Sequence, residues 1–308
     1  MRILTTALIL VVTLLLVPIS TYFFGIPLNT TDKEALYTLL YVNLAIILIC
    51  FIVSSLTKNY SQTDKIWSLA PILYVWIVTY YGAFHTRLVL MSILVTLWGV
   101  RLTYNFALKG GYSWKIWAGE EDYRWKVLRE KPEFQPRWKW VAFNFFFISG
   151  YQNILILFFT LPILIALQFR DVPLNVWDCV ATGLFLFFLV YETVADHQHW
   201  QFQKEKWRRI HLGDELVSPY DKGFMDQGLW QYSRHPNYFG EQGVWLSFYL
   251  FSVAASGLWL NWSITGSLLL VILFQNSSMF GEEISAKKYL LYQTYQKNVP
   301  RFIPRFRK

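Results

Sequence analysis

Long apolar runs recur along this chain, and the short stretches between them hold most of its charged residues. About eight of these runs have the roughly 18–25 residues that an α-helix needs to cross the hydrocarbon core of a membrane. We therefore predict an all-α fold, a polytopic membrane helical bundle of about seven or eight transmembrane helices. The expected helices lie near residues 3–24, 36–57, 66–84, 88–107, 141–169, 175–196, 240–258 and 261–280.

Three of the runs carry a feature that bears on this prediction. The run at 141–169 is longer than a membrane requires, and we expect a break around Gly150. The run at 66–84 contains Pro71, which disfavours an uninterrupted helix. The first run could be mistaken for a signal peptide, but no convincing cleavage site of small residues follows it, so we expect it to be retained.

The loop charges indicate an orientation. Lys and Arg residues are concentrated in the segments 109–139, 204–234 and 287–308. The alternate connections hold few of them: 25–35, 85–87 and 170–174. Because cytoplasmic loops carry an excess of Lys and Arg, eight spans place all three basic segments and both termini in the cytoplasm. The host membrane is then a bacterial inner membrane or the endoplasmic reticulum.

The composition agrees with a membrane protein. Hydrophobic residues make up 55% of the 308 residues and charged residues only 16%, which is too apolar for an ordinary soluble domain. The net charge of +8 could suit nucleic acid, but membrane topology explains the placement of the basic residues better, so we expect no nucleic-acid partner. Cys50 and Cys179 lie in apolar runs and favour neither a disulfide framework nor a metal site.

A dense polar motif stands where a basic loop meets an apolar run. It reads Ser233-Arg234-His235-Pro236-Asn237-Tyr238-Phe239-Gly240-Glu241. Pro236 suits the first turn of a helix, and the free N–H groups of a helix that starts there can bind an anion beside Arg234. The alternative is a helix start without a ligand, anchored at the interface by Arg234 and Tyr238.

Two carboxylates end the run at 175–196. Glu192 and Asp196 are four residues apart, so both lie on one helix face, where like charges repel. A bound cation or hydrogen-bond donor would relieve this repulsion, and a salt bridge to Arg101 or Arg234 is the alternative. Two carboxylates near a cytoplasmic helix end suit the binding of ribose hydroxyls or of an amide.

Three further residues are candidates for chemistry. Asp64 lies at the entrance of the third run, and Trp98 and Arg101, three residues apart, can face one side of the fourth. An arginine at the membrane edge is a functional candidate by default, unless it snorkels to the lipid headgroups. The loop that contains Glu120–Trp125 is rich in tryptophan, and we predict that it folds as a cap over the cytoplasmic face.

Taken together, these motifs resemble the DUF1295 family, which is related to the C-terminal domain of steroid 5-alpha-reductases. The resemblance covers about residue 60 to the C-terminus. It rests on Glu192-x-x-x-Asp196-x-Gln198, Gly228-Leu229-Trp230, the run from Ser233 to Glu241, and Tyr292-x-x-Tyr295 with the Ile303-Pro304 ending. We therefore predict N-terminal transmembrane helices at residues 1–60 and a steroid 5-alpha-reductase-like membrane domain at residues 61–308.

The resemblance implies a cofactor site. The reductase branch of this superfamily implies a cytoplasm-facing NADPH site capped by cytoplasmic loops, and a substrate cavity that opens toward the lipid. Asn237 and Glu241 match cofactor-site positions, Asp196 matches an aspartate that contacts the cofactor, and Glu192 stands where steroid reductases have an asparagine. The predicted cofactor-binding residues are Glu192, Asp196, Arg234, His235, Asn237, Tyr238, Glu241 and Tyr295.

The predicted catalytic residues are Asp64, Trp98 and Arg101. The reductases of the superfamily activate an enone carbonyl with an acid and a tyrosine. Asp64 is a plausible counterpart of the acid, whereas Trp98 stands near the place where a tyrosine is expected. Hydride transfer to a C=C bond requires an acid at the carbonyl oxygen and a cofactor ring held against the substrate.

The preferred function is an NADPH-dependent oxidoreductase that reduces a C=C bond of a lipophilic, steroid-like or enone-like substrate. The alternative is an S-adenosylmethionine-dependent methyltransferase of the isoprenylcysteine or phospholipid type, because carboxylates and aromatic faces suit a sulfonium. A third possibility is a non-catalytic lipid-binding or transport protein, although no internal symmetry is visible. The expected partners are a lipophilic small molecule and membrane lipids.

Overall fold

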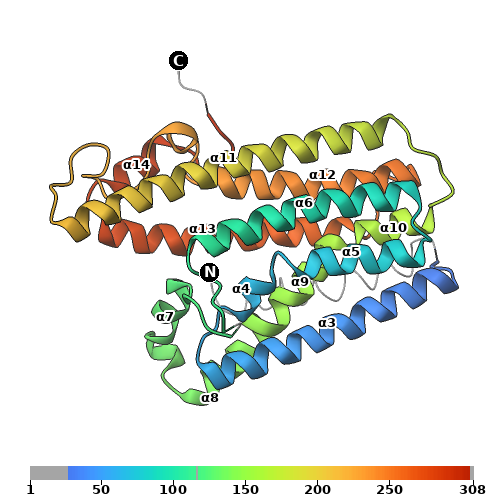
Figure 1. Cartoon of the computed structure of the whole chain (residues 1–308), viewed down its shortest axis with the longest axis horizontal. Helices are drawn as coiled ribbons and strands as arrows, with labels where there is room; N and C mark the ends of the chain where they lie inside the picture. The colour runs from blue at the N-terminus through green and yellow to red at the C-terminus, as the bar shows by residue number, and fades with distance from the viewer. Residues whose placement is uncertain (1–26, 116, 306–308) are drawn as a thin grey trace. The chain divides into compact units, whose positions relative to one another are not determined.

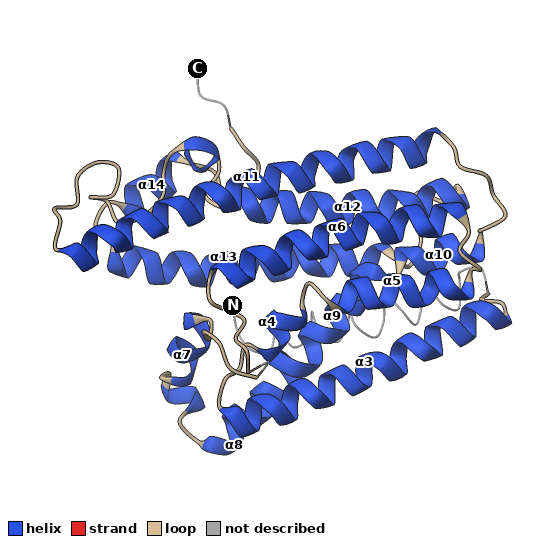
Figure 2. Cartoon of the chain, in the orientation of Figure 1, coloured by secondary structure: helices blue, strands red, loops and turns tan. Residues whose placement is uncertain are grey.

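The computed structural model describes residues 27–115 and 117–305. These residues form helices joined by turns and loops, and none of them lies in a strand (Figure 1, Figure 2). The predicted all-α fold is therefore confirmed. The expected first membrane helix, at residues 3–24, lies outside the described residues.

Five helices in the described part of the chain are long and apolar enough to cross a membrane. They are Thr30–Thr57 (α3), Thr86–Leu108 (α6), Arg137–Gln168, Val176–Leu212 (α11) and Ile264–Lys288 (α13). Each corresponds to one of the predicted runs, so the chain is a helical membrane protein. The number of seven or eight spans stays a prediction.

Two other predicted runs form helices with different bounds. The run at 66–84 contains only Ala70–Tyr81 (α5), preceded by the short helix Gln62–Ile66 (α4). Helix α5 is short because Pro71 stands in its first turn, and because a left-handed backbone at Ala83 and Phe84 prevents its continuation. The run at 240–258 belongs to a helix that begins earlier, Pro236–Ser256 (α12).

The stretch from Arg137 to Gln168 is irregular, as predicted. It consists of Arg137–Phe143 (α8), a π-helix at Asn144–Tyr151 (η3), Gln152–Thr160 (α9) and Pro162–Gln168 (α10). The π-helix contains Gly150, where an added Cβ atom would lie 2.8 Å from the carbonyl oxygen of Phe145. Glycine therefore permits the wider turn at this point.

The chain divides into two compact units, which we describe separately. Unit 1 comprises the described residues within 1–182 and 246–270, and unit 2 comprises those within 183–245 and 271–308. In unit 1, α3 packs against α5 and α9. Unit 2 contains residues 183–212 of α11, 236–245 of α12 and 271–288 of α13. It also contains a 3₁₀ turn at Gly228–Gln231 (η4) and the helix Tyr292–Asn298 (α14).

A buried ion pair lies within unit 1. The guanidinium of Arg87, at the start of α6, contacts both carboxylate oxygens of Asp178 at 2.8 and 2.9 Å. It also donates to the carbonyl oxygens of Val172 and Pro173, at 2.9 Å each. This bidentate arrangement satisfies a charge that is fully buried, and it fixes the connection before α11.

Candidate functional site

Helix α12 begins at Pro236, as the sequence predicts. The residue before it, His235, accepts the first helical bond from the N–H of Phe239 at 3.1 Å. Ser233 is fully buried, and its hydroxyl oxygen lies 3.3 Å from the N–H of His235 and 3.0 Å from the carbonyl oxygen of Arg301. The polar motif therefore includes the helix start itself and a contact with the end of the chain.

The C-terminal tail, which we define as residues 299–305, runs alongside the approach to α12. The N–H of Arg234 donates to the carbonyl of Pro300 at 2.9 Å, and the N–H of His235 donates to that of Arg301 at 3.0 Å. In the opposite direction, the N–H of Arg305 donates to the carbonyl of Tyr232 at 3.0 Å. The tail is thus joined through its backbone to the segment before α12 in unit 2.

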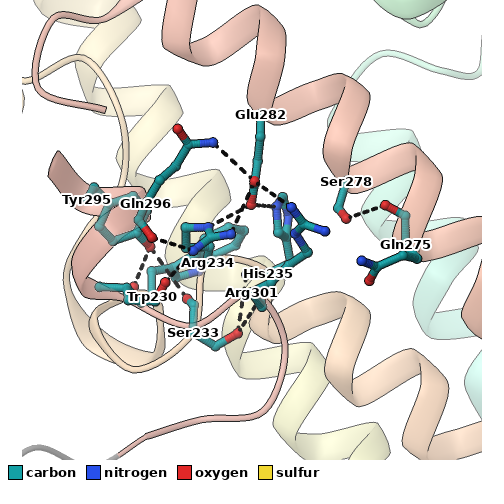
Figure 3. Close-up of polar contacts among 11 residues, drawn as sticks. Trp230, Ser233, Arg234, His235, Gln275, Ser278, Glu282, Tyr295, Gln296 and Arg301 are labelled. Atoms are coloured by element: carbon teal, nitrogen blue, oxygen red, sulfur yellow. Dashed lines mark hydrogen bonds and ion pairs between the residues drawn. The ribbon is translucent and has the colours of Figure 1, made fainter. Parts of the chain in front are cut away.

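The guanidinium of Arg234 is used inside the protein. Its Nε and Nη2 atoms contact the two carboxylate oxygens of Glu282 at 2.7 and 3.2 Å. Its Nη1 atom donates to the carbonyl oxygen of Gln296, at 2.8 Å, and to that of Val299. Arg234 is buried and joins the start of α12 to α13, α14 and the tail (Figure 3).

Three more side chains converge on Glu282. They are His235 at 2.9 Å, Gln296 at 3.1 Å and Arg301 at 3.3 Å. We call these residues, together with Arg234, the Glu282 cluster (Figure 3). Five hydrogen bonds reach one buried carboxylate, so its charge is well compensated. The structure thus pairs Arg234 with α13 in place of the α11 carboxylates considered from the sequence.

Tyr295 supports the same region. Its hydroxyl group donates to the carbonyl oxygen of Trp230 at 2.5 Å (Figure 3), and burial raises its pKa above the ordinary value for tyrosine. The indole N–H of Trp230 in turn donates to the carbonyl of Ala195 on α11 at 3.1 Å. The position shown for Tyr295 is therefore a link within unit 2, and its contact with a cofactor stays a prediction.

The backbone geometry explains why glycine stands at the first position of the Gly228-Leu229-Trp230 motif. Gly228 has a φ of 58°, in the left-handed region, and an added Cβ atom there would lie 2.6 Å from the Gln198 side-chain oxygen. The N–H of Leu229 donates to that same oxygen at 2.9 Å. The left-handed backbone favours glycine at this position, and the hydrogen bond from Leu229 ties the turn before α12 to helix α11.

Helices α11 and α12 meet along a polar face within unit 2. An added Cβ atom on Gly240 would lie 2.6 Å from Cβ of Glu192, so the two helices approach closely there. One turn away, the side-chain N–H of Asn237 donates to Asp196 Oδ1 at 3.2 Å. Glu192, Asp196 and Glu241 are all buried, and Glu241 accepts from the indole of Trp245 at 3.1 Å.

Asn237 offers an acceptor on this polar face. Its Oδ1 atom is buried and has no hydrogen-bond partner among the described residues. The carboxylate of Asp196 fixes the orientation of the amide, because a flipped amide would place two oxygens against each other. The free oxygen can accept from a ribose hydroxyl or a carboxamide N–H, and the neighbouring carboxylates accept from the same groups. The residues therefore fit the ribose and carboxamide groups of a dinucleotide.

Aromatic rings flank the polar face. The ring of Tyr238 stacks on the imidazole of His235, with centroids 5.3 Å apart, and on Phe274 at 4.5 Å. The ring of Phe239 contacts Tyr191 edge-on at 5.7 Å. The predicted residues Asn237, Tyr238 and His235 are thus brought together around the first turn of α12.

The predicted catalytic residues lie in unit 1. Asp64 is half-buried and accepts from the indole N–H of Trp125 at 3.0 Å. Burial raises the pKa of Asp64, the nearby charge of Asp122 raises it further, and Arg124 opposes the change. Trp125 belongs to the short helix Tyr123–Arg129 (α7). Because it lies 61 residues from Asp64 in the chain, spacing in the sequence does not pair the two residues.

The tryptophan-rich loop is folded against α4 and the residues just before it, and its place over the cytoplasmic face stays a prediction. The ammonium group of Lys65 donates to the carbonyl of Ala118 at 2.5 Å, and the N–H of Asp122 donates to the Ser61 hydroxyl at 2.9 Å. The N–H of Tyr60 donates to a Glu121 carboxylate oxygen at 2.8 Å. These contacts hold the loop over the residues that surround Asp64.

Trp98 and Arg101 lie on α6. Trp98 is fully buried, and Arg101 is half-buried. The helix lies close to the turn after α4, as the distance of 2.7 Å between the hydroxyl oxygens of Ser68 and Thr103 shows. Unit 1 therefore places this part of α6 beside the segment that follows Asp64, and the catalytic roles of the three residues stay predictions.

Sequence reasoning did not foresee the Glu282 cluster. The motifs of the sequence include no role for Glu282, and Arg301 belongs there only to the basic segment 287–308. A carboxylate near the end of an apolar run was the available signal, since such a group is costly unless it is paired. Its partners lie up to 48 residues away, so spacing alone does not name them.

Comparison with known proteins decides the family. The family model described as "Protein of unknown function (DUF1295)" matches residues 50–299, which is most of the chain. The chain belongs to the DUF1295 family. The resemblance inferred from the motifs is thereby confirmed, and the match begins slightly before the predicted residue 60.

This DUF1295 chain also resembles an uncharacterized protein of the fission yeast Schizosaccharomyces pombe. The two are 40% identical over 266 residues, which cover 82% of this chain and 75% of the yeast protein. No solved structure matches the chain. The DUF1295 match includes every residue of the predicted site from Asp64 to Tyr295, and Arg301 lies just beyond it.

Proposed function

We propose that this protein is an integral membrane oxidoreductase that binds NADPH through unit 2 and reduces a C=C bond of a lipophilic, enone-like substrate. The observation that carries the proposal is the unpartnered oxygen of Asn237 on a face lined by buried carboxylates. When bound, NADPH supplies the hydride for such a reduction. The family match and the apolar helices support a membrane protein of this superfamily.

The residues of the polar face bind and orient. Asp196 and Glu192 accept hydrogen bonds from hydroxyl groups, and Asn237 accepts a further one through Oδ1. A buried acceptor without a donor costs about 1–3 kcal/mol, and a ligand that supplies the donor recovers this free energy. Burial between two closely packed helices holds the carboxylates in place, which is the preorganisation that a binding site requires.

The proposal retains the catalytic candidates in unit 1. A general acid must hold its proton at the working pH, and the raised pKa of Asp64 favours the protonated form. Arg101 and Trp98 are the other candidates from the sequence. We also retain the predicted orientation, with both termini and the three basic segments in the cytoplasm, where NADPH is available.

A second candidate is an S-adenosylmethionine-dependent methyltransferase of the isoprenylcysteine or phospholipid type. It is favoured by the three buried carboxylates Glu192, Asp196 and Glu241, because acidic groups and nearby rings suit a sulfonium. A reductase needs binding of NADPH, and a methyltransferase needs binding of S-adenosylmethionine. A non-catalytic lipid-binding protein needs neither.

The experiment measures the binding of NADPH to the full-length protein in detergent, by energy transfer from tryptophan to the bound nicotinamide. Asn237→Ala should weaken binding about ten- to hundredfold, because it removes an acceptor and leaves Asp196 without its amide donor. The matched control is Asn276→Ala, since Asn276 is exposed and its amide contacts only the carbonyl of Ile272 in its own helix.

The outcomes separate the candidates. The proposal predicts that the wild type binds NADPH and that the Asn276 variant binds equally well. Binding of S-adenosylmethionine without NADPH would replace the proposal with the methyltransferase. If the Asn237 variant bound NADPH as tightly as the wild type, the polar face would not be the cofactor site.

A further inference from the structure

The Glu282 cluster holds more positive than negative charge. Two guanidinium groups, from Arg234 and Arg301, contact the single carboxylate of Glu282. The other two members of the cluster, Gln296 and His235, add hydrogen-bond donors and no negative charge. One arginine charge is therefore not compensated within the cluster.

Arg234 makes its hydrogen bonds within the protein. It donates four hydrogen bonds to protein oxygens, two of them to Glu282, and its side chain is only 9% exposed. A guanidinium group has five N–H donors in a fixed plane, so four bonds within the protein leave little for another partner. These bonds hold the tail against the start of α12, and a contact of Arg234 with a cofactor stays a prediction.

Arg301 is placed differently. Its Nη2 atom makes the longest of the contacts with Glu282, 3.3 Å, where closer donors already occupy both carboxylate oxygens. Its Nε atom is buried and has no hydrogen-bond partner among the described residues. At 26% exposure the side chain still reaches the surface of unit 2. An available N–H and an uncompensated charge thus belong to one residue.

We infer that Arg301 binds a phosphate group, and that this group is the diphosphate of the nucleotide cofactor. The inference rests on the proposed function, which it extends by naming the tail residue that takes the anionic part of the ligand. A phosphate oxygen pairs with the free Nε–H and balances the second arginine charge. The carbonyl of Arg301 accepts from the N–H of His235, so this residue is anchored beside the first turn of α12.

The position agrees with the rest of unit 2. Asn237 is two residues after His235, so the hydroxyl-binding face and Arg301 are tied to the same helix start. A nucleotide has hydroxyl groups next to its phosphates, and it needs acceptors beside a cation. The polar face supplies the acceptors and Arg301 supplies the cation. The tail then binds ligand as well as closing the fold.

The test compares two variants of the tail in the full-length, detergent-solubilised protein. Arg301→Gln removes the proposed contact, and Arg305→Gln is the matched control, because its side chain is exposed and only its backbone N–H is bonded to Tyr232. The probes are NADPH, inorganic pyrophosphate and adenosine, each titrated by calorimetry. The melting temperature of each variant shows whether it is folded.

The inference predicts that Arg301→Gln weakens the binding of NADPH and of pyrophosphate about ten- to hundredfold, since a hydrogen bond to a charged group is lost. Adenosine, which lacks a phosphate, should bind equally to both variants. Arg301→Lys, which keeps the charge but lacks the planar donor fork, should lose part of the affinity. It replaces the glutamine variant if that variant does not fold.

The failures of the two proposals differ. If the wild type binds pyrophosphate through Arg301 but does not bind NADPH, the phosphate site stands and the reductase does not. Micelles doped with phosphatidic acid identify the source of the phosphate. If Arg301→Gln weakened the binding of this lipid but not of NADPH, the site would bind a lipid headgroup, and the assignment to the nucleotide would be wrong. If Arg301→Gln and Arg305→Gln bind pyrophosphate equally, the inference is wrong.

Discussion

Glu282→Gln tests whether the Glu282 cluster stabilises the fold. The substitution keeps the shape of the side chain but removes the negative charge that Arg234 and Arg301 contact at 2.7 and 3.3 Å. Glu282 is 3% exposed, so solvent cannot replace the lost charge. Breaking a buried pair by removing one partner costs roughly 3–5 kcal/mol, and we expect a loss near 3 kcal/mol because Arg234 keeps its carbonyl acceptors.

The assay combines thermal unfolding with hydrogen exchange. The N–H groups of Arg234 and His235 donate to the tail, so they should exchange about a hundredfold faster once the tail loosens. Glu283→Gln is the control on the adjacent residue, where an exposed pair with Lys287 is worth at most about 1 kcal/mol. Equal stability and equal exchange in the two variants would refute the reasoning.

Two further predictions concern one residue in each unit. Gly240→Ala should lower the free energy of unfolding by about 1–3 kcal/mol, because the added Cβ would collide with Glu192. The control is Gly183→Ala in α11, which has open space around it and should be neutral or stabilising in the same thermal assay. The raised pKa of Asp64 means that the folded state holds this proton more tightly than the unfolded chain, so its contribution to stability falls as the pH rises from about 4. Asp64→Asn should remove this decline from melting temperatures measured between about pH 4 and 8, and an unchanged pH profile would contradict the assignment.

Patterns that depend on local chemistry could be predicted from the sequence. The apolar runs located the long helices, because membrane length and hydrophobicity act within one segment. Pro236 located the start of α12, since its fixed φ and missing N–H suit a first turn. Gly150 located the irregular stretch of the fifth run for a similar local reason.

Partners that are distant in the chain could not be predicted. Arg234 looked available for an anion, but the fold brings Glu282 within 2.7 Å of it across 48 residues. Asp64 was chosen without its partner Trp125, which lies 61 residues away. Hydropathy and spacing describe a residue's own helix, whereas the pairing of buried charges depends on which helices pack together.

The two ends of α5 differ in the same way, since the sequence predicts a disturbance at one end and not at the other. The apolar run at 66–84 suggested one helix that crosses the membrane, yet the helix has only 12 residues. Pro71 was recognised as a disturbance. The left-handed backbone at Ala83 and Phe84 has no signal in the sequence, because these residues rarely adopt it.

The central claim is that unit 2 binds a nicotinamide cofactor through the polar face of α11 and α12. The most direct measurement is the melting temperature of the purified wild type with saturating NADPH and, separately, with saturating S-adenosylmethionine. A ligand present at about a hundred times its Kd stabilises the folded state by roughly 2.7 kcal/mol. We predict this stabilisation with NADPH and its loss in Asn237→Ala. Stabilisation by S-adenosylmethionine alone, or by neither compound, would contradict the account.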